Sequence, residues 1–318
     1  MESSNSQLRL KDFHSRLRGG LPVSTRHRAE AGSRLTKAAH SGPLFAYHKN
    51  GIFAGMAKRL VVGNWKSYIE SPSEARALAL ALRRKARAVP GVDVWLAPPY
   101  PLLPAVAEVL ASSPIKVGAQ ALSANPGGGP ASTHDGSPTR VGHTGEVSAN
   151  MLKQVGAQFA LVGHSERRAE GEGDEQVRAQ LLQALGAKLT AVLCIGEHER
   201  TPDGAHFSFI ERQIVVALDA LPPKAKVIIA YEPVWAIGKS AEDAMQPQDL
   251  EQMAIFIRKT LVETLDRRSG LKIPILYGGS VEPDNAHTLL ALGGVNGFLV
   301  GHESVELDPF LEIIKACK

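Results

Sequence analysis

Eight short apolar runs alternate with longer amphipathic stretches from Lys58 to the end of the chain, and this alternation constrains the fold more than any other feature. Each run is nearly unbroken and rich in β-branched residues, which is typical of parallel strands covered on both faces. After the first run, Ser71 and Pro72 have the pattern of a helix start. The order predicts eight βα units around a parallel sheet. The predicted strands are residues 59–65, 92–98, 115–120, 158–164, 189–196, 226–232, 273–279 and 296–301.

The polar residues favour a closed (β/α)8 barrel over an open doubly wound sheet. Eight units in about 260 residues suit a barrel, although an open sheet is a rival. Polar residues follow several strands, where a barrel brings them to one mouth and an open sheet spreads them along a line. We therefore predict an α/β barrel as a single domain over residues 57–318. The polar residues are Asn64, Lys66, His164, Glu166, Glu197, Glu232 and Ser280.

Residues 1–56 are predicted to form a disordered basic extension. They hold nine Lys and Arg against three acidic residues, so the net +4 of the whole chain leaves +4 − 6 = −2 for the rest. The segment is rich in Arg and Ser and lacks sustained periodicity. Three interpretations remain open: an extension upstream of a true start at Met56, an Arg-rich transit segment, or a basic arm that contacts nucleic acid or an acidic surface. Few aromatic residues are available for stacking on bases, which weakens the third.

The composition argues against several other classes. No apolar run reaches the roughly 18 residues of a membrane span, so a membrane is not an expected partner of the barrel. A nucleic acid is not an expected partner of the barrel either. Cys194 and Cys317 cannot build a disulfide framework and stand in no zinc-binding pattern, so no metal is expected. A reducing compartment, the cytoplasm, fits best, and an organelle is the alternative if the extension is a genuine transit segment.

The stretch YEPVWAIGKS contains a Gly-Lys-Ser that resembles part of a nucleotide-binding loop. Such a loop needs a glycine five positions before the Gly-Lys pair, so that successive backbone N–H groups can surround the phosphates. That position is Pro233, which has no N–H and a fixed φ. The stretch is better explained as a carboxylate, Glu232, followed by a hinged lid.

Three polar residues together supply the groups that an aldose–ketose isomerisation needs. Glu232 could remove a proton next to a carbonyl, His164 could polarise that carbonyl, and Lys66 could stabilise the negative charge that develops. Taken singly, each has a structural explanation, such as a core histidine or a surface lysine. Backbone N–H groups of the glycine-containing turns at residues 278–281 and 300–303 could bind an anion.

Eight segments resemble, in order and approximate spacing, the motifs of the triosephosphate isomerase family. One such motif alone is weakly specific, whereas eight in register are very specific. The resemblance extends from Lys58 to near Lys318. The segments are GNWK (63–66), APPY (97–100), TGE (144–146), VGHSERR (162–168), CIGE (194–197), YEPVWAIG (231–238), YGGSV (277–281) and FLVG (298–301).

The resemblance implies a homodimeric, cofactor-free barrel of glycolysis and gluconeogenesis that interconverts dihydroxyacetone phosphate and D-glyceraldehyde 3-phosphate. A neutral electrophilic histidine and a water-excluding lid are carried over from the family. Two alternatives stay open, namely an isomerase of another short phosphorylated ketose such as a tetrulose phosphate, and a barrel that binds sugar phosphates without turnover. By position, the resemblance implies that Glu232 is the general base, that His164 is the electrophile, and that the substrate is contacted by Lys66 and Asn64. It implies that the phosphate is bound by Gly238, Ser280, Gly301 and His302. It further implies a supporting ion pair of Glu166 with Arg167, support from Cys194 and Tyr277, and contact of Thr144 with the partner's active site.

Several positions depart from the family pattern. The lid lacks the usual Thr-Gly before Lys239, so its second hinge is about two residues shorter, and we expect activity with altered lid kinetics. His302 replaces a glycine and could add a titratable contact with the phosphate dianion. Tyr68 follows the GNWK motif where the family usually has Asn, and it is interpreted as packing. The connection at residues 121–143 is expanded by roughly a dozen residues, so it either wraps the partner more extensively or weakens the dimer.

Overall fold

In the computed structural model of the protein, which describes residues 59–86, 89–125, 130–132, 138–140, 143–219, 221–239 and 245–318, eight parallel strands close into a barrel. The strand order is β1-β10-β9-β8-β7-β6-β3-β2, and β1 closes the ring by pairing with both β10 and β2. The predicted barrel is therefore confirmed, and the open sheet is excluded. The strands are β1 (Arg59–Asn64), β2 (Val92–Ala97), β3 (Lys116–Ala119), β6 (Phe159–Val162), β7 (Thr190–Ile195), β8 (Val227–Tyr231), β9 (Ile275–Tyr277) and β10 (Gly297–Val300).

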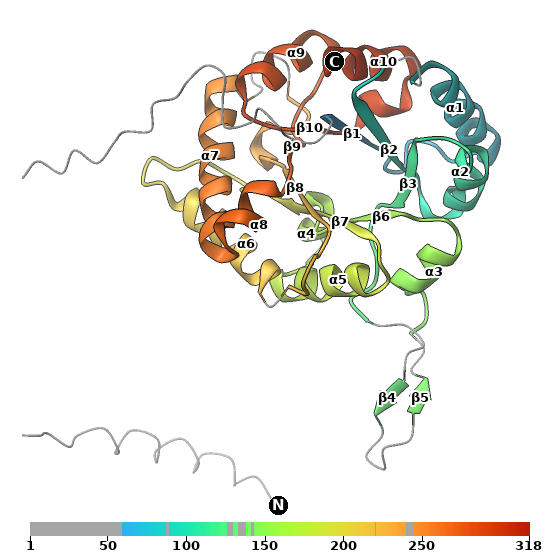
Figure 1. The fold of residues 1–318 in the computed structure, drawn as a ribbon, viewed down its shortest axis with the longest axis horizontal. Coiled ribbons are helices and arrows are strands. Elements are labelled where there is room, and N and C mark those ends of the chain that lie inside the picture. The colour runs from blue at the N-terminus through green and yellow to red at the C-terminus, as the bar shows by residue number, and fades with distance from the viewer. Residues whose placement is uncertain are drawn as a thin grey trace, which may run out of the picture. The chain divides into compact units, whose positions relative to one another are not determined.

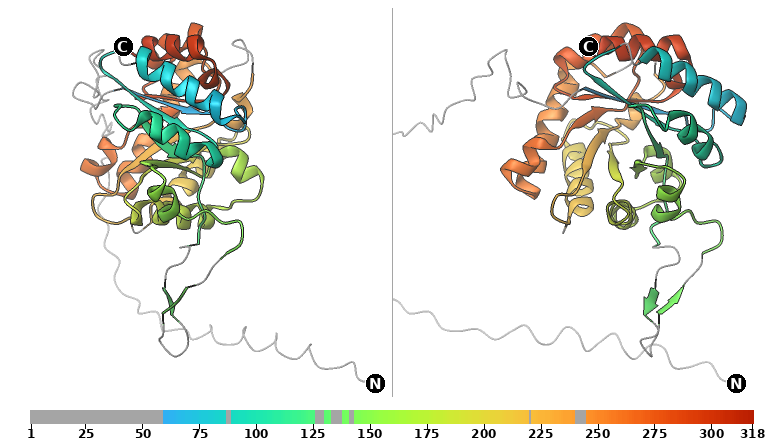
Figure 2. Two further views of the ribbon diagram at one scale, coloured as in Figure 1. Left: turned by 90° about the vertical axis from the view of Figure 1, so that its right-hand side faces the viewer. Right: turned by 45° about the vertical axis from the view of Figure 1, so that its right-hand side comes forward.

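Helices surround the strands as an outer ring (Figures 1 and 2). The first helix begins as its sequence predicts, because Ser71 is the N-cap, its hydroxyl accepts from the Glu74 N–H, and Pro72 opens the helix. The α-helices are α1 (Pro72–Lys85), α2 (Leu103–Leu110), α3 (Ala149–Gln154), α4 (Ser165–Ala169), α5 (Asp174–Gly186), α6 (Ala205–Leu218), α7 (Pro247–Thr264), α8 (Arg267–Lys272), α9 (Pro283–Leu292) and α10 (Leu307–Ala316). Short 3-10 helices are η2 (Tyr100–Leu102), η3 (Val234–Ala236) and η4 (His302–Val305).

The strands are buried on both faces, as their unbroken apolar runs predict. Alternate side chains of a strand point to opposite sides of the sheet. In β1, Leu60 and Val62 belong to one buried cluster with Trp95 and Phe159, whereas Val61 belongs to a larger cluster that includes the helices. The first cluster fills the barrel and the second joins the strands to the helical ring.

The expanded connection at residues 121–143 contains a two-stranded antiparallel ladder, β4 (Pro130–Ser132) with β5 (Pro138–Arg140). The sequence predicted only a long loop here. Each strand contains a proline, which normally argues against a strand. In a two-stranded ladder, however, both strands are edges and tolerate a missing N–H donor.

The chain divides into two units, Met1–Ile52 and Phe53–Lys318, and every described residue belongs to the second. The predicted disordered extension at residues 1–56 therefore lies outside the described residues. Among the helices that the structure describes, none is long and apolar enough to cross a membrane.

Candidate active site

Glu232 stands directly after β8, where two glycines give its backbone and side chain room. A Cβ on Gly196 would lie 1.8 Å from the carbonyl oxygen of Glu232, and a Cβ on Gly278 would lie 2.9 Å from its Cγ. The Glu232 N–H donates to the carbonyl of Ile195 at 2.7 Å, which continues the pairing of β7 and β8. The side chain is held inside the barrel mouth and only 2% of it is exposed.

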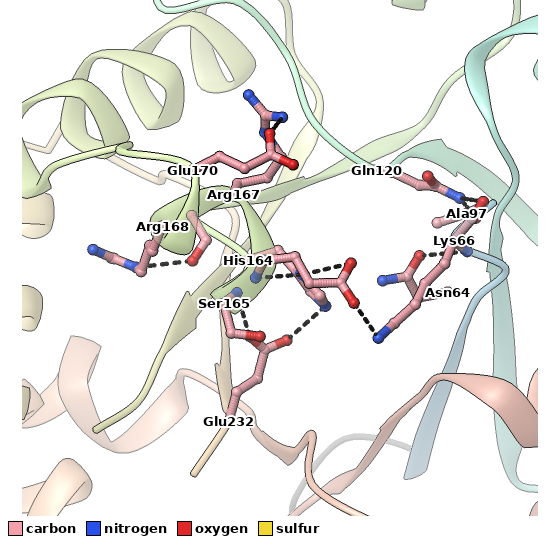
Figure 3. Close-up of polar contacts among 12 residues, drawn as sticks. Asn64, Lys66, Ala97, Gln120, His164, Ser165, Arg167, Arg168, Glu170 and Glu232 are labelled. Carbon is pink, nitrogen blue, oxygen red and sulfur yellow. Dashed lines mark hydrogen bonds and ion pairs between the residues drawn. The ribbon is translucent and has the colours of Figure 1, made fainter. Parts of the chain in front are cut away.

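The Glu232 carboxylate has two polar neighbours at the start of α4, which follows β6 (Figure 3). Its Oε2 accepts from the backbone N–H of Ser165 at 2.8 Å, and its Oε1 lies 3.4 Å from His164 Nε2. Burial of a carboxylate is costly unless hydrogen bonds compensate, and the Ser165 N–H provides one. Sequence reasoning missed Ser165, because it acts through its backbone and carries no signature of its own.

His164 is the N-cap of α4, and its Nδ1 accepts from the Glu166 N–H at 3.3 Å. A nitrogen that accepts a hydrogen bond carries no proton, so the contact favours the neutral tautomer with the proton on Nε2. Nε2 is also the nitrogen nearer Glu232. The ring can therefore donate a hydrogen bond into the cavity that it shares with the carboxylate.

Lys66 reaches the same cavity from a strained turn after β1. Its φ is 44°, a left-handed value that is unusual for a residue with a side chain. Two amides hold this conformation: Asn64 Oδ1 accepts from the Lys66 N–H at 3.1 Å, and Gln120 Nε2 donates to the Lys66 carbonyl at 2.8 Å. Gln120 also donates to the Ala97 carbonyl at 2.9 Å. Sequence reasoning missed Gln120, although its place directly after β3 is the position where the other polar site residues stand.

The Lys66 ammonium pairs with the Glu166 carboxylate at 2.6 Å. Burial opposes ionisation of Glu166, but the hydrogen bond and charge of Lys66 outweigh it and lower the pKa of this carboxyl. The expected ion pair of Glu166 with Arg167 was wrong. Arg167 instead contacts Glu172 at 2.9 Å and also pairs with Glu170. Successive residues of a helix point about 100° apart, so neighbours in α4 face different partners.

The residues predicted to bind phosphate line the same cavity as the three chemical groups. This cavity of about 280 Å³ is bounded by Asn64, Lys66, His164, Glu232, Gly238, Ser280, Gly301 and His302, among others. Ser280 Oγ also donates to the carbonyl of Ala236 at 3.0 Å, which fastens the turn after β9 to the lid. Gly238 has a φ of 68°, so the lid tip uses a conformation that favours glycine.

The two further residues predicted in support, Cys194 and Tyr277, are fully buried behind the cavity. Burial, reinforced by the neighbouring Glu232 carboxylate, raises the pKa of the Cys194 thiol well above its usual range. Cys194 therefore presents a neutral side chain to Glu232. Burial also raises the pKa of Tyr277, whose hydroxyl finds no hydrogen-bond partner among the described residues.

Glu197 anchors the first hinge of the lid, a role that the sequence did not indicate. Its Oε1 accepts from Tyr231 Oη and Trp235 Nε1, both at 2.8 Å. The Arg200 guanidinium lies 5.2 Å from the centre of the Trp235 ring and 3.4 Å from the same carboxylate oxygen. The second hinge was predicted to be short, and most of it, residues 240–244, lies outside the described residues.

A second cavity of about 640 Å³ adjoins the first and shares Asn64, Lys66 and His164 with it. Gly145 and Glu146 line it, while the preceding residue, Thr144, is exposed. Thr144 is therefore free to meet another molecule. The described residues contain no group of three or more His, Cys, Asp or Glu side chains that could hold a metal ion.

The comparisons with known proteins point to one family. The profile of the triosephosphate isomerase family matches residues 59–317. Triosephosphate isomerases of Roseiflexus sp. (strain RS-1) and Thermus thermophilus are each 38% identical to the chain, over 81% and 82% of it and 97% and 99% of their own lengths. The crystal structure of triosephosphate isomerase from Bartonella henselae superposes with a TM-score of 0.67 at 31% identity, over 81% of this chain and 98% of that one. The chain belongs to the triosephosphate isomerase family.

Proposed function

We propose that the protein interconverts dihydroxyacetone phosphate and D-glyceraldehyde 3-phosphate through an enediolate, as a step of glycolysis and gluconeogenesis. The observation that carries this function is the meeting of a buried carboxylate, an imidazole and an ammonium group at one cavity of about 280 Å³. The curated relatives are named for the same activity, so a tetrulose phosphate isomerase or a non-catalytic barrel is not favoured.

In the proposed reaction, Glu232 takes a proton from the carbon next to the substrate carbonyl. The electron pair left on that carbon moves toward the carbonyl, and the oxygen gains negative charge. His164 Nε2–H donates to this oxygen, while Lys66 and the Asn64 amide face it from the other side. The hydroxyl on the deprotonated carbon gives its proton, by way of the His164 imidazole, to the oxygen of the former carbonyl. That hydroxyl oxygen becomes the new carbonyl oxygen as Glu232 returns its proton to the neighbouring carbon, and no net electron enters or leaves the substrate.

The phosphate end of the substrate is assigned to Gly238, Ser280, Gly301 and His302. Backbone N–H groups of turns are suited to bind a phosphate dianion. The lid, whose tip is Gly238, would exclude water, and a dry cavity strengthens every charge interaction with the enediolate. Glu166 supports the site by holding the Lys66 ammonium.

We also propose a homodimer in which Thr144 meets the partner's active site. The exposure of Thr144 and the open second cavity support this arrangement. A cytoplasmic location is proposed as well, with an organelle as the alternative if residues 1–56 are a transit segment. Mass spectrometry of the native amino terminus decides between a start at Met56, a processed transit segment and a retained basic arm.

A coupled assay of glyceraldehyde 3-phosphate isomerisation tests the function. The full chain is compared with its Glu232→Gln variant, which keeps the shape of the side chain but cannot act as the base. We expect a fast parent and a variant whose kcat falls by about three or more orders of magnitude. A folded but inactive parent would contradict the proposal, and tetrulose phosphates would then be the next substrates.

A further inference from the structure

Two residues at the rim of the active-site cavity contact each other across a large sequence separation. The rings of Tyr68, which follows β1, and His302, which begins η4, meet edge to face, with centroids 5.4 Å apart and planes at 86°. Both residues line the cavity that holds Gly238, Ser280 and Gly301. The imidazole thus stands next to Gly301, in the part of the cavity assigned to phosphate.

The turn that carries Lys66 also fixes Tyr68. The Tyr68 N–H donates to the Trp65 carbonyl at 3.1 Å, which closes the turn around the left-handed Lys66. On the other side, a Cβ on Gly301 would lie 3.5 Å from Lys66 Cε, so the β10 turn packs against the same lysine side chain. The backbone positions of Tyr68 and His302 are therefore set by the site itself.

The His302 side chain has little else to hold it. It is 66% exposed, and its Nδ1 lies 3.5 Å from Glu303 Oε1. A long exposed contact of this kind restrains a ring weakly. Aromatic rings favour an edge-to-face arrangement, so Tyr68 is the stronger restraint on which way the imidazole points.

We infer that Tyr68 is a positioning residue that holds His302 toward the phosphate end of the cavity, where the protonated imidazole strengthens binding of a doubly charged anion. The inference rests on the proposed function only in taking that end as the phosphate site. It assigns to Tyr68 a role beyond the packing that the sequence indicated. It also gives the site a preference for dianions over monoanions that grows as the pH falls.

Other charged and titratable groups line the same cavity and also affect the binding of an anion. Lys66 and Lys239 line the same cavity and contribute positive charge. Glu303 from η4 and Glu282 from the turn after β9 contribute negative charge. His164 and Glu232 face the cavity from the reacting end. A variant that removes only the His302 charge is therefore needed to isolate its effect.

Sulfate is a suitable probe because it stays doubly charged between pH 5.8 and 8, whereas a phosphate ester loses its second charge near pH 6. The dissociation constant of sodium sulfate is measured by calorimetry at constant ionic strength and at both pH values. The full-length proteins are the parent, His302→Gln, Tyr68→Leu, the double variant, and Tyr68→Phe, which keeps the ring. Thermal midpoints confirm that each is folded.

We expect sulfate to bind more tightly to the parent at pH 5.8 than at pH 8. The ratio of the sulfate Kd at pH 8 to the Kd at pH 5.8 should be about two- to fivefold larger in the parent than in His302→Gln. Tyr68→Phe should keep this larger Kd ratio. Tyr68→Leu should lose most of it, so that its Kd ratio is close to that of the double variant, which lacks His302 as well. Equal ratios in the parent and His302→Gln would overturn the inference. A full gain in Tyr68→Leu would remove the positioning role. Sulfate binding needs no turnover, so an inactive parent would refute the proposed function and leave this test intact.

Discussion

Lys66 shows how a single residue combines strain and charge at the site. A residue with a side chain in the left-handed region costs on the order of 1 kcal/mol, and the amides of Asn64 and Gln120 hold it there. The strained turn aims the ammonium into the cavity, where Glu166 holds it. The turn therefore lowers the stability of the fold, but it places the positive charge where the proposed reaction needs it.

The Lys66–Glu166 pair predicts a pH-dependent contribution to stability. The folded pKa of Glu166 is lowered, so the stabilisation is present above its ordinary value of 4.5 and is lost as the pH falls through the folded value. Since Glu166 is largely exposed, we expect Glu166→Gln to lower the unfolding free energy at pH 7 by less than about 1 kcal/mol. Urea titrations of both proteins at pH 7 and at the lowest pH where both stay folded measure this difference. A difference that persists at the low pH contradicts the assignment.

The sequence predicted much of the site and missed the residues that act on other residues. Asn64, Lys66, His164 and Glu232 share one cavity because the ends of parallel strands meet there. Ser165 and Gln120 were missed because their contribution is a hydrogen bond to a neighbour, whose geometry depends on the closed barrel. For the same reason the partner of Glu166 was assigned to the adjacent Arg167 and not to Lys66, which is distant in sequence.

At the scale of elements, the lid depends on contacts at its first hinge. Trp235 Nε1 donates to Glu197, and Ser280 holds the carbonyl of Ala236. Motion of the lid toward a bound phosphate must change the surroundings of Trp235. The other two tryptophans, Trp65 and Trp95, are buried in the barrel, so their surroundings should change little.

We therefore predict that a phosphate-containing substrate analogue changes the tryptophan fluorescence of the protein, despite the shortened second hinge. Trp235→Phe should abolish the change, and Glu197→Gln should alter the closing rate in stopped-flow measurements, because it removes the charge that holds the indole N–H. A parent without any fluorescence response, or an undiminished response in Trp235→Phe, would show that this hinge does not move as proposed.

The strands and first helix were predictable because their signals are local. All eight predicted strands are present, each within its predicted residues and each shortened by one or two residues at one or both ends. The ladder of β4 and β5 was missed because prolines obscure its strand pattern. Sequence periodicity cannot fix strand ends, since these depend on where neighbouring strands stop pairing.

At the scale of the whole molecule, the barrel exposes an apolar side chain on α3 and has a large cavity beside the active site. Met151 on α3 is 56% exposed, and the second cavity opens next to Lys66 and His164. A partner that covers both features would bury the Met151 side chain and bring Thr144 to a neighbouring site. The proposed dimer would thus complete both active sites.

We predict a solution mass of about twice the 34.0 kDa of the chain by light scattering at micromolar concentration. Met151→Lys should lower the mass toward that of the monomer, because a charge in a buried interface is unfavourable. Val215→Lys on α6, where the native side chain is 44% exposed, is the matched control and should keep the parental mass. A concentration-independent monomer in the parent would refute the dimer.

The most direct test of the central claim, that Glu232 transfers a proton through an enediolate, is isomerisation of dihydroxyacetone phosphate in D2O followed by NMR. A proton held by a carboxylate exchanges with solvent, so we predict substantial deuterium at C2 of the glyceraldehyde 3-phosphate formed by the parent, and neither product nor label with Glu232→Gln. Product that carries only hydrogen moved directly from C1 to C2 would indicate a hydride shift and contradict the assignment of Glu232 as the base.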